Sequence, residues 1–318
     1  MSAPENKYGI APATEEFFLR QLALWPMAAA NFAALEGVEV REFPRVGLLD
    51  MKVQFNPARR VSSAAKVDAA SLKARKCFLC GENRPAEQIS EPWGDYEILI
   101  NPFPIFPRHL TVPAKAHTPQ RILGRIEDMC RLALKLRGMT VFYNGPRCGA
   151  SAPDHMHFQA GNSGFLPLPA YLDSHLEPIQ PGEAARIWTP EGLPMGVVVI
   201  DGYKPGDIAE IFALVYKALP VPEGEEEPMM NILCYAPEGL PDGYLRLVLI
   251  PRRKHRPAFY GTEGDDCWLI SPASVDMGGV FITPREEDFS RISADTLRQI
   301  LDEVCWTPAE VAELIDKI

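Results

Sequence analysis

The sequence contains no apolar run long enough to cross a membrane. A bilayer-spanning helix needs about 20 consecutive apolar residues. The most apolar segments here, 195–203 and 244–251, are much shorter and are typical of buried strands. The first residues also lack the basic and then apolar order of a secretory signal peptide. We therefore expect a soluble, cytoplasmic protein that makes no contact with a membrane.

Positive charge is in deficit. Lysine and arginine number 32 against 42 aspartate and glutamate residues, which leaves a net charge of -10. A protein that binds nucleic acid through its surface neutralises phosphates with an excess of basic residues. We therefore expect no nucleic-acid partner. A few local arginines could still bind a small anionic substrate. The length of 318 residues, with 47% hydrophobic residues, allows one large or two ordinary globular domains.

Closely spaced cysteines are scarce. The seven cysteines are scattered and odd in number, which favours a reducing compartment over a disulfide framework. Only Cys77 and Cys80, in "CFLCG", are separated by two residues, a spacing that lets two sulfurs reach one tetrahedral ion. A redox pair and a buried apolar pair are the alternatives, but no thioredoxin-like βαβ pattern surrounds the motif. Zinc would need two further ligands, for which histidines are the obvious candidates.

Histidine is also scarce, and two of the six histidines alternate in "APDHMHFQAG", residues 152–161. On a β-strand, His155, His157 and Gln159 would project from one face. Such a row is either a water-facing strand or the reactive face of an enzyme. A neutral imidazole beside a bound phosphate can attack phosphorus and form a phosphoramidate, so the second interpretation has a specific chemistry.

The other histidines carry weaker signals. His109 lies at the edge of an expected strand, and with His155 it is a candidate for completing the metal site. His117 and His255 lie among basic residues, so we expect both to be exposed. His175 lies in an expected loop and has no assigned role.

A loop of small residues precedes the histidine row. In "YNGPRCGASAP", small side chains let backbone N–H groups approach an anion closely. Asn144 and Ser151 add side-chain donors, and Arg147 could add positive charge. The arginines of "PRRKHRP", which are Arg252, Arg253 and Arg256, could do the same, although a solvated charge cluster is the alternative.

The periodicity of the chain predicts an α+β fold. Residues 15–35 have helical periodicity interrupted at Pro26, and an amphipathic helix is expected over 119–138, ending at Gly138. Short apolar segments with proline-rich borders predict strands between and after them. Two helices are expected at the end of the chain, with Ser293 and Thr307 as their N-caps.

The layout of the first half partly recurs in the second. Residues 230–257 repeat the order of 96–119, with an apolar strand, a turn-rich gap, a second apolar strand ending at proline, and then a basic residue and a histidine. Residues 275–288 then stand where the histidine row stood, without histidines. We interpret this as two units, 1–180 and 181–318, of which the second has lost its catalytic strand. Two unrelated halves are the alternative.

Three motifs in order carry a resemblance to a known family. "NGPRCGASAPDHMHFQ" resembles the active-site segment, of the form N…G-(A/C)-S…H-x-H-x-Q, of the galactose-1-phosphate uridylyltransferase branch of the histidine triad (HIT) superfamily. "NPFPIFPRHLTVPAKAH" resembles the preceding strand pair. "VQFNPARRVSS…KCFLCGENRP" is similar to the arginine-containing strand and zinc CxxC of the same branch. The motifs cover roughly residues 50–160. One departure is Asp154, where the branch has proline before its first histidine.

The resemblance implies a fold and a set of roles. It implies two HIT-like units, each a mostly antiparallel sheet with packed helices, the second degenerate. It implies that His157 is the nucleophile and that Gln159 binds the phosphoryl group. It implies phosphate binding by Asn144 and Ser151, with Arg147 as a further candidate. The motif's arginine is matched by Arg59 or by Arg60. A structural zinc ion would be held by four residues: Cys77, Cys80, His109 and His155.

The resemblance also implies the reaction. We expect a nucleotidyltransferase that moves a nucleoside monophosphate from a nucleotide sugar to a sugar 1-phosphate through a covalent nucleotidyl-histidine. Phosphorylases or hydrolases of dinucleoside polyphosphates or GDP-galactose-type nucleotide sugars share the histidine strand and are the first alternative. A non-catalytic module that binds zinc or nucleotide is the second. The expected partners are a small nucleotide and a sugar phosphate, and the chain is expected to be a monomer or a homodimer.

Overall fold

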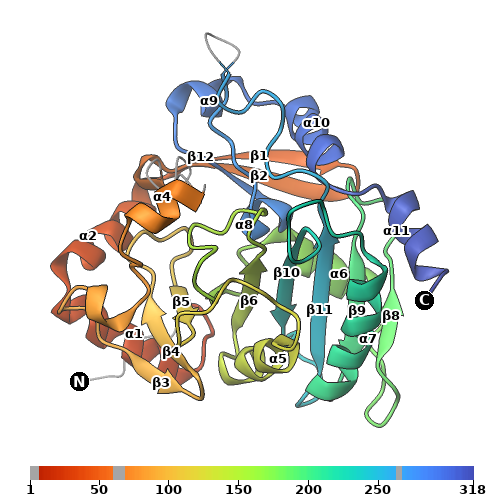
Figure 1. The fold of residues 1–318 in the computed structure, drawn as a ribbon, viewed down its shortest axis with the longest axis horizontal. Coiled ribbons are helices and arrows are strands. Elements are labelled where there is room, and N and C mark those ends of the chain that lie inside the picture. The colour runs from red at the N-terminus through yellow and green to blue at the C-terminus, as the bar shows by residue number, and fades with distance from the viewer. Residues whose placement is uncertain (1–6, 60–68, 263–266) are drawn as a thin grey trace.

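The computed structural model describes residues 7–59, 69–262 and 267–318, which form one large and one small β-sheet with helices packed around them (Figure 1). The strands are β1 (Glu39–Val46), β2 (Leu49–Phe55), β3 (Glu91–Trp93), β4 (Tyr96–Ile100), β5 (His109–Pro113), β6 (Met139–Asn144), β7 (His157–Asn162), β8 (Arg186–Trp188), β9 (Val198–Gly202), β10 (Met230–Tyr235), β11 (Leu245–Pro251) and β12 (Val280–Thr283). The α-helices are α1 (Pro12–Leu24), α2 (Pro26–Ala34), α4 (Ala69–Ala74), α5 (Ile126–Lys135), α6 (Pro167–His175), α7 (Pro205–Ala218), α8 (Ser274–Met277), α9 (Glu286–Arg291), α10 (Ala294–Val304) and α11 (Pro308–Ile315).

The large sheet joins the two halves of the chain. Its nine strands follow the order β3-β4-β5-β7-β6-β10-β11-β9-β8, and every neighbouring pair is antiparallel. The halves meet where β6 pairs with β10. The expected α+β class is therefore confirmed, and strands from both halves of the chain form one continuous antiparallel sheet.

Both faces of the large sheet are buried, because successive side chains of its central strands enter different cores. Val141 and Tyr143 of β6 belong to a core built with α1, α2, α5 and α7, whereas Phe142 belongs to a second core. The small sheet, α6 and α10 cover this second face. Its strand order is β1-β2-β12, and Figure 1 shows it above one end of the large sheet.

Several local expectations are confirmed. The helix at the start of the chain breaks at Pro26 into α1 and α2. Ser293 caps α10 by accepting a hydrogen bond from the Thr296 N–H, and Thr307 caps α11 in the same way. No helix in the described ranges is both long and apolar enough to span a bilayer.

The helix expected over 119–138 is shorter than its periodicity indicates. It ends near Gly138 as expected, where φ is +80° and an added Cβ would lie 2.3 Å from the Gly9 carbonyl oxygen. However, α5 begins only at Ile126, and Gly124 has a φ of +81° that a helix does not tolerate. The segment before α5 is irregular because its hydrogen bonds go to other parts of the chain.

The expected position of residues 275–288 is wrong. β12 does not lie beside β11, as an exact repeat would require; it pairs in parallel with β2 in the small sheet. The edge of β11 is already occupied by β9, whose residues pair with Leu245 to Leu249. The place beside β11 that a repeated histidine strand would take is therefore filled by an earlier strand, β9.

A buried carboxyl group lies just before β10. Glu227 accepts hydrogen bonds from the Tyr143 hydroxyl at 2.5 Å and from the Ile122 N–H at 2.9 Å, and it is 5% exposed. Burial raises its pKa from 4.5 to about 7, although its two hydrogen bonds and the charge of Arg121 act in the opposite direction. The charge of this carboxylate in turn contributes to raising the pKa of the neighbouring Tyr216.

We expect Glu227 to make stability depend on pH. The folded state binds the proton more tightly than the unfolded state, so the benefit is complete below pH 4.5 and is lost as the pH rises through about 7. The loss amounts to about 3 kcal/mol. Glu227→Gln should flatten this dependence and be more stable than the wild type at about pH 8, as measured by urea unfolding across the pH range. The exposed Glu223→Gln is the control, and an unchanged pH dependence in Glu227→Gln would contradict the assignment.

Candidate functional site

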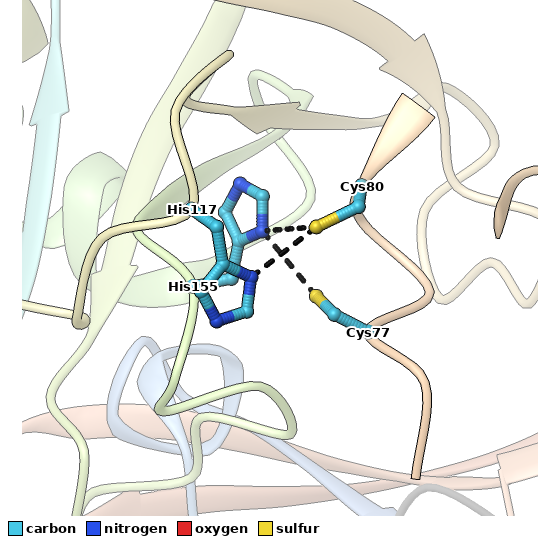
Figure 2. Close-up of side chains that lie close together, drawn as sticks. All are labelled: Cys77, Cys80, His117 and His155. Carbon is cyan, nitrogen blue, oxygen red and sulfur yellow. Dashed lines mark hydrogen bonds between the residues drawn. The ribbon is translucent and has the colours of Figure 1, made fainter. Parts of the chain in front are cut away.

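Four side chains from three segments converge in a candidate metal centre (Figure 2). Cys77 and Cys80 come from the turn after α4, His117 follows β5, and His155 precedes β7; their ligand atoms all lie within 4.8 Å of one another. Nδ1 of His155 is 3.3 Å from Sγ of Cys77 and 3.6 Å from Sγ of Cys80, and Nδ1 of His117 is 3.2 Å from Sγ of Cys80. In tetrahedral zinc sites these atoms lie about 3.5 Å apart.

The surroundings of both imidazoles fit metal binding. Nε2 of His155 lies 2.7 Å from the carbonyl oxygen of Ala114, so Nε2 carries the proton and Nδ1 presents a lone pair to the sulfurs. Nε2 of His117 faces the Asp154 carboxylate at 3.8 Å, and Arg75 binds the other oxygen of Asp154 at 2.7 Å. A carbonyl and a carboxylate are the outer partners that metal-bound histidines commonly have. The donor set therefore fits a closed four-coordinate metal ion.

The structure corrects one of the four expected ligands. His109 does not lie in this cluster; His117, eight residues further along, takes its place. His117 is exposed, as expected, but its exposure does not prevent its Nδ1 from reaching Cys80. The physical reason is the position of β5: His109 begins the strand and lies within the sheet, whereas His117 lies four residues beyond the end of the strand, beside the cysteines (Figure 2).

His109 instead orients Gln159. The Ile105 N–H donates to Nδ1 of His109 at 3.1 Å, so the ring proton is on Nε2, which donates to Oε1 of Gln159 at 3.0 Å. Asn101 donates to the same oxygen at 3.3 Å. Burial and the nearby charge of Arg59 lower the pKa of His109 to about 3, which keeps this ring neutral. The oxygen of Gln159 is therefore engaged, whereas its amide NH2 donates to no group in the part of the chain that the structure describes and is available to a ligand.

His157 is the first residue of β7 and is 4% exposed. Its Nδ1 lies 2.8 Å from the carbonyl oxygen of His155, so Nδ1 carries the proton and Nε2 has the lone pair. Burial lowers the pKa of His157 to about 4, and the ring is therefore neutral at neutral pH. In the ranges that the structure describes, no group is hydrogen-bonded to Nε2. This is the tautomer and charge state that a nucleophilic imidazole needs.

The loop of small residues lies against the second half of the chain. Gly149 has a φ of +96°, and a Cβ there would lie 2.4 Å from Cβ of Ala273, so only glycine fits. Among the described residues, the backbone N–H groups of residues 149–151 donate to no protein group. They are available to an anion.

A buried polar network holds Asn144 beside this loop. Oδ1 of Asn144 accepts from Nδ2 of Asn231 at 3.0 Å and from the Ser274 N–H at 2.8 Å. Asn231 also donates to the carbonyl of Cys148 and accepts from Arg252 at 2.6 Å. Arg252 is therefore a buried structural residue rather than a surface cation, and Asn231 and Ser274 hold the side chain of Asn144 in place.

Several of the expected site residues line one cleft of about 960 Å³. His157, Gln159, Asn144 and Ser151, all expected site residues, border it together with the loop residues Gly149 and Ala150.

Three arginines from separate segments also line this cleft: Arg59, Arg75 and Arg256. Arg256 is held by the Ser271 hydroxyl at 2.8 Å, and Arg59 donates to the Phe103 carbonyl at 2.8 Å. The cleft therefore combines a buried imidazole with donors and positive charge suited to a phosphorylated ligand.

Two other expected cations are placed differently. Arg147 does not line this cleft; it lies in a smaller cleft of about 310 Å³, where its Nε is 3.2 Å from Glu225. Arg253 binds the Cys305 carbonyl and Glu310. Arg60 lies outside the described residues. Of the two arginines that match the motif, the structure therefore describes Arg59, which lines the cleft.

Some residues of the site were not identified from the sequence. His255 was expected to be exposed but is half-buried and lines the cleft, where burial and the charges of Arg256 and Arg252 lower its pKa to about 3. Asn231 and His117 were assigned no role. A histidine four residues after a strand and an isolated asparagine within one carry no local signal, because their partners are distant in sequence.

Comparison with known proteins identifies one matching family. Residues 17–162 match the family described as "Domain of unknown function (DUF4922)". No curated protein matches the chain significantly in sequence.

Yeast Ap4A phosphorylase Apa2 has a similar structure, with a TM-score of 0.62 and 17% sequence identity over 89% of this chain and 97% of that chain. Its complex with AMP gives a TM-score of 0.59 at 16% identity over 91% of this chain and 97% of that chain. Its complex with Ap4A gives a TM-score of 0.57 at 16% identity over 88% of this chain and 96% of that chain. At these identities the likeness shows the fold alone, and this chain shares its α+β fold with that phosphorylase.

Proposed function

We propose that this protein is a nucleotidyltransferase that carries a nucleoside monophosphate on Nε2 of His157. The observation that carries the proposal is the state of this imidazole: Nδ1–H is bound to the His155 carbonyl, and the ring borders the cleft. Neutral imidazole is a good nucleophile toward phosphorus, and burial keeps it neutral.

In the first step, Nε2 attacks the α-phosphorus of the donor. The P–N bond forms as the bond from that phosphorus to the bridging oxygen breaks, and the leaving phosphate or sugar phosphate departs with the electron pair. The ring then becomes positively charged, and the hydrogen bond from Nδ1 to the His155 carbonyl strengthens. In the second step, an acceptor phosphate oxygen attacks the same phosphorus, and the P–N bond breaks to regenerate neutral His157.

The remaining groups bind and orient the phosphoryl group. Gln159 donates its amide NH2 to a nonbridging oxygen, because His109 and Asn101 occupy its carbonyl oxygen. The N–H groups of residues 149–151, which donate to no protein group among the described residues, and the side chain of Asn144 bind further oxygens. Preorganised donors of this kind stabilise the charge of phosphoryl transfer more than acid–base catalysis would.

This donor set favours zinc, because zinc prefers tetrahedral coordination by thiolates and imidazoles, of which the cluster offers two each. Cys77, Cys80, His117 and His155 would hold it. With all four positions supplied by protein, its contribution would be structural: it would fix the turn that carries His155 and therefore the start of β7.

The cleft favours a donor with an apolar and a charged part. Aromatic side chains in its lining, which include Trp25, Phe78 and Phe103, suit a nucleobase, and the arginines suit its phosphates. We take residues 1–180 as the unit that carries the chemistry and 181–318 as the unit that completes the cleft. The partners are then a small nucleotide and a phosphorylated acceptor in the cytoplasm.

Two acceptors are supported by different observations. The CxxC and histidine motifs resemble the uridylyltransferases, which favours a sugar 1-phosphate as acceptor and a nucleotide sugar as donor. The likeness over nearly the whole chain to an Ap4A phosphorylase favours inorganic phosphate. The nucleotidyl-histidine step is the same in both cases.

Intact-mass spectrometry tests the shared step. The protein would be incubated with separate nucleotide sugars and dinucleoside polyphosphates, without acceptor. One donor should add the mass of a nucleoside monophosphate in an acid-labile bond. Chasing the labelled protein with sugar 1-phosphate, inorganic phosphate or buffer then identifies the acceptor. No labelled protein with any donor, alongside turnover of one of them, would overturn the proposal.

A further inference from the structure

Gln120 lies beside the proposed nucleophile and is absent from every motif discussed above. Its side chain is completely buried, between the end of β6 and the start of β7. Oε1 accepts from the His157 N–H at 2.8 Å, and Nε2 donates to the carbonyl oxygens of His157 and Asn144, each at 3.0 Å. One amide therefore binds the backbone of two proposed site residues.

This amide replaces a missing stretch of strand. The pairing of β6 with β7 ends at Phe142 and Gln159, so β6 makes no ladder hydrogen bond with His157. In an antiparallel sheet, the N–H and C=O of one residue point to the same neighbour. Gln120 supplies both the acceptor and the donor on that side of His157, as a residue of β6 would have done.

The segment that carries Gln120 is attached along the chain that leads to the nucleophile. The Thr118 carbonyl accepts from the Met156 N–H at 2.6 Å, and the Gln120 N–H donates to the Pro153 carbonyl at 3.0 Å. His117, three residues before Gln120, belongs to the metal cluster. Side-chain and backbone contacts together leave Gln120 little freedom to move relative to His157.

We propose that Gln120 is a positioning residue for His157, an inference that rests on the proposed function. It sets the separation between the start of β7 and the end of β6, and so aligns Nε2 of His157 and the amide of Asn144 on the same phosphoryl group. Displacement of a reacting group by about 1 Å can cost on the order of 10²-fold in rate. Gln120 should therefore affect the rate of nucleotidyl transfer far more than the binding of the donor.

Gln120→Met tests this, because methionine has a similar size and makes none of the three hydrogen bonds. Gln21→Met is the matched control: Gln21 is equally buried and also clamps backbone, with Nε2 at 2.7 Å from the Glu87 carbonyl and Oε1 at 2.7 Å from the Ile89 nitrogen. Both variants should lose thermal stability. Only Gln120→Met should slow labelling of His157 in a single turnover, by about 10²-fold, with the donor dissociation constant changed less than about threefold.

A second measurement separates this inference from the proposed function. The nitrogen chemical shifts of the His157 imidazole report its hydrogen bonding, which should be Nδ1–H bound to the His155 carbonyl in the wild type and in Gln21→Met. In Gln120→Met these shifts should change, because the displaced His157 no longer holds the same position relative to that carbonyl. If Gln120→Met labels at the wild-type rate, or keeps unchanged imidazole shifts, the inference is wrong. If the wild type labels with no donor, the proposed function fails, and the measurement of the imidazole shifts still decides the role of Gln120. If Gln120→Met does not fold, Gln120→Glu replaces it, because glutamate retains the acceptor for the His157 N–H but loses the donors. Slower labelling of Gln120→Glu would support the inference, and labelling at the wild-type rate would overturn it.

Discussion

Replacing His157 by alanine should abolish formation of the covalent nucleotidyl-protein and lower turnover by at least about 10³-fold. This is the largest effect that we expect on activity, because the Nδ1–H of His157 is bound to the His155 carbonyl and Nε2 therefore presents its lone pair in the cleft that Gln159 and Asn144 also line. The loss should appear in the rate of labelling and not in donor affinity, since His157 contacts the phosphorus chiefly in the transition state.

The measurement is intact-mass labelling together with steady-state turnover for the donor that labels the wild type. His175→Ala is the matched control, because His175 is an exposed histidine at the end of α6 that stacks on Tyr171 and does not line the cleft. It should label and turn over as the wild type does. Turnover within about tenfold of the wild type in His157→Ala would exclude the nucleophilic role.

Removing the two thiolates has the largest expected effect on stability. The double substitution Cys77→Ser and Cys80→Ser should remove the bound metal and lower the free energy of unfolding by more than about 4 kcal/mol. The cluster joins the turn after α4, the segment after β5 and the turn before β7, so its loss releases three segments together. Activity should fall too, because His155 holds Nδ1 of His157 through its carbonyl.

Elemental analysis of protein purified without chelator measures the metal directly, with about one zinc per chain expected in the wild type. Cys267→Ser, a half-buried cysteine outside the cluster, should retain it. His117→Ala should lose the metal, whereas His109→Ala should keep it and lose rate through the reorientation of Gln159. Retention of full metal content by His117→Ala, with its loss in His109→Ala, would restore the ligand set expected from the sequence.

Local physical chemistry made much of the fold predictable. Periodicity located the strands that are buried on both faces, and Pro26, Ser293 and Thr307 marked helix ends through effects that act within one turn. The same reasoning failed for residues 119–125. Their apolar spacing suits a helix, but their backbone groups bind the turn before β7 and the carboxylate of Glu227 instead.

The sequence by itself determined which chemical groups are present: a CxxC pair, an H-x-H-x-Q row and a loop of small residues, whose combination favours zinc and a phosphorylated ligand. Only the tertiary structure decided how they are used. His109 and His117 are eight residues apart and chemically identical, and the course of the chain after β5 sends one to Gln159 and the other to Cys80. Likewise, Gln120 acquires its position because β6 and β7 separate at the nucleophile and leave backbone groups that a distant side chain must satisfy. Side-chain identity is local, but convergence and hydrogen-bond satisfaction are properties of the folded chain.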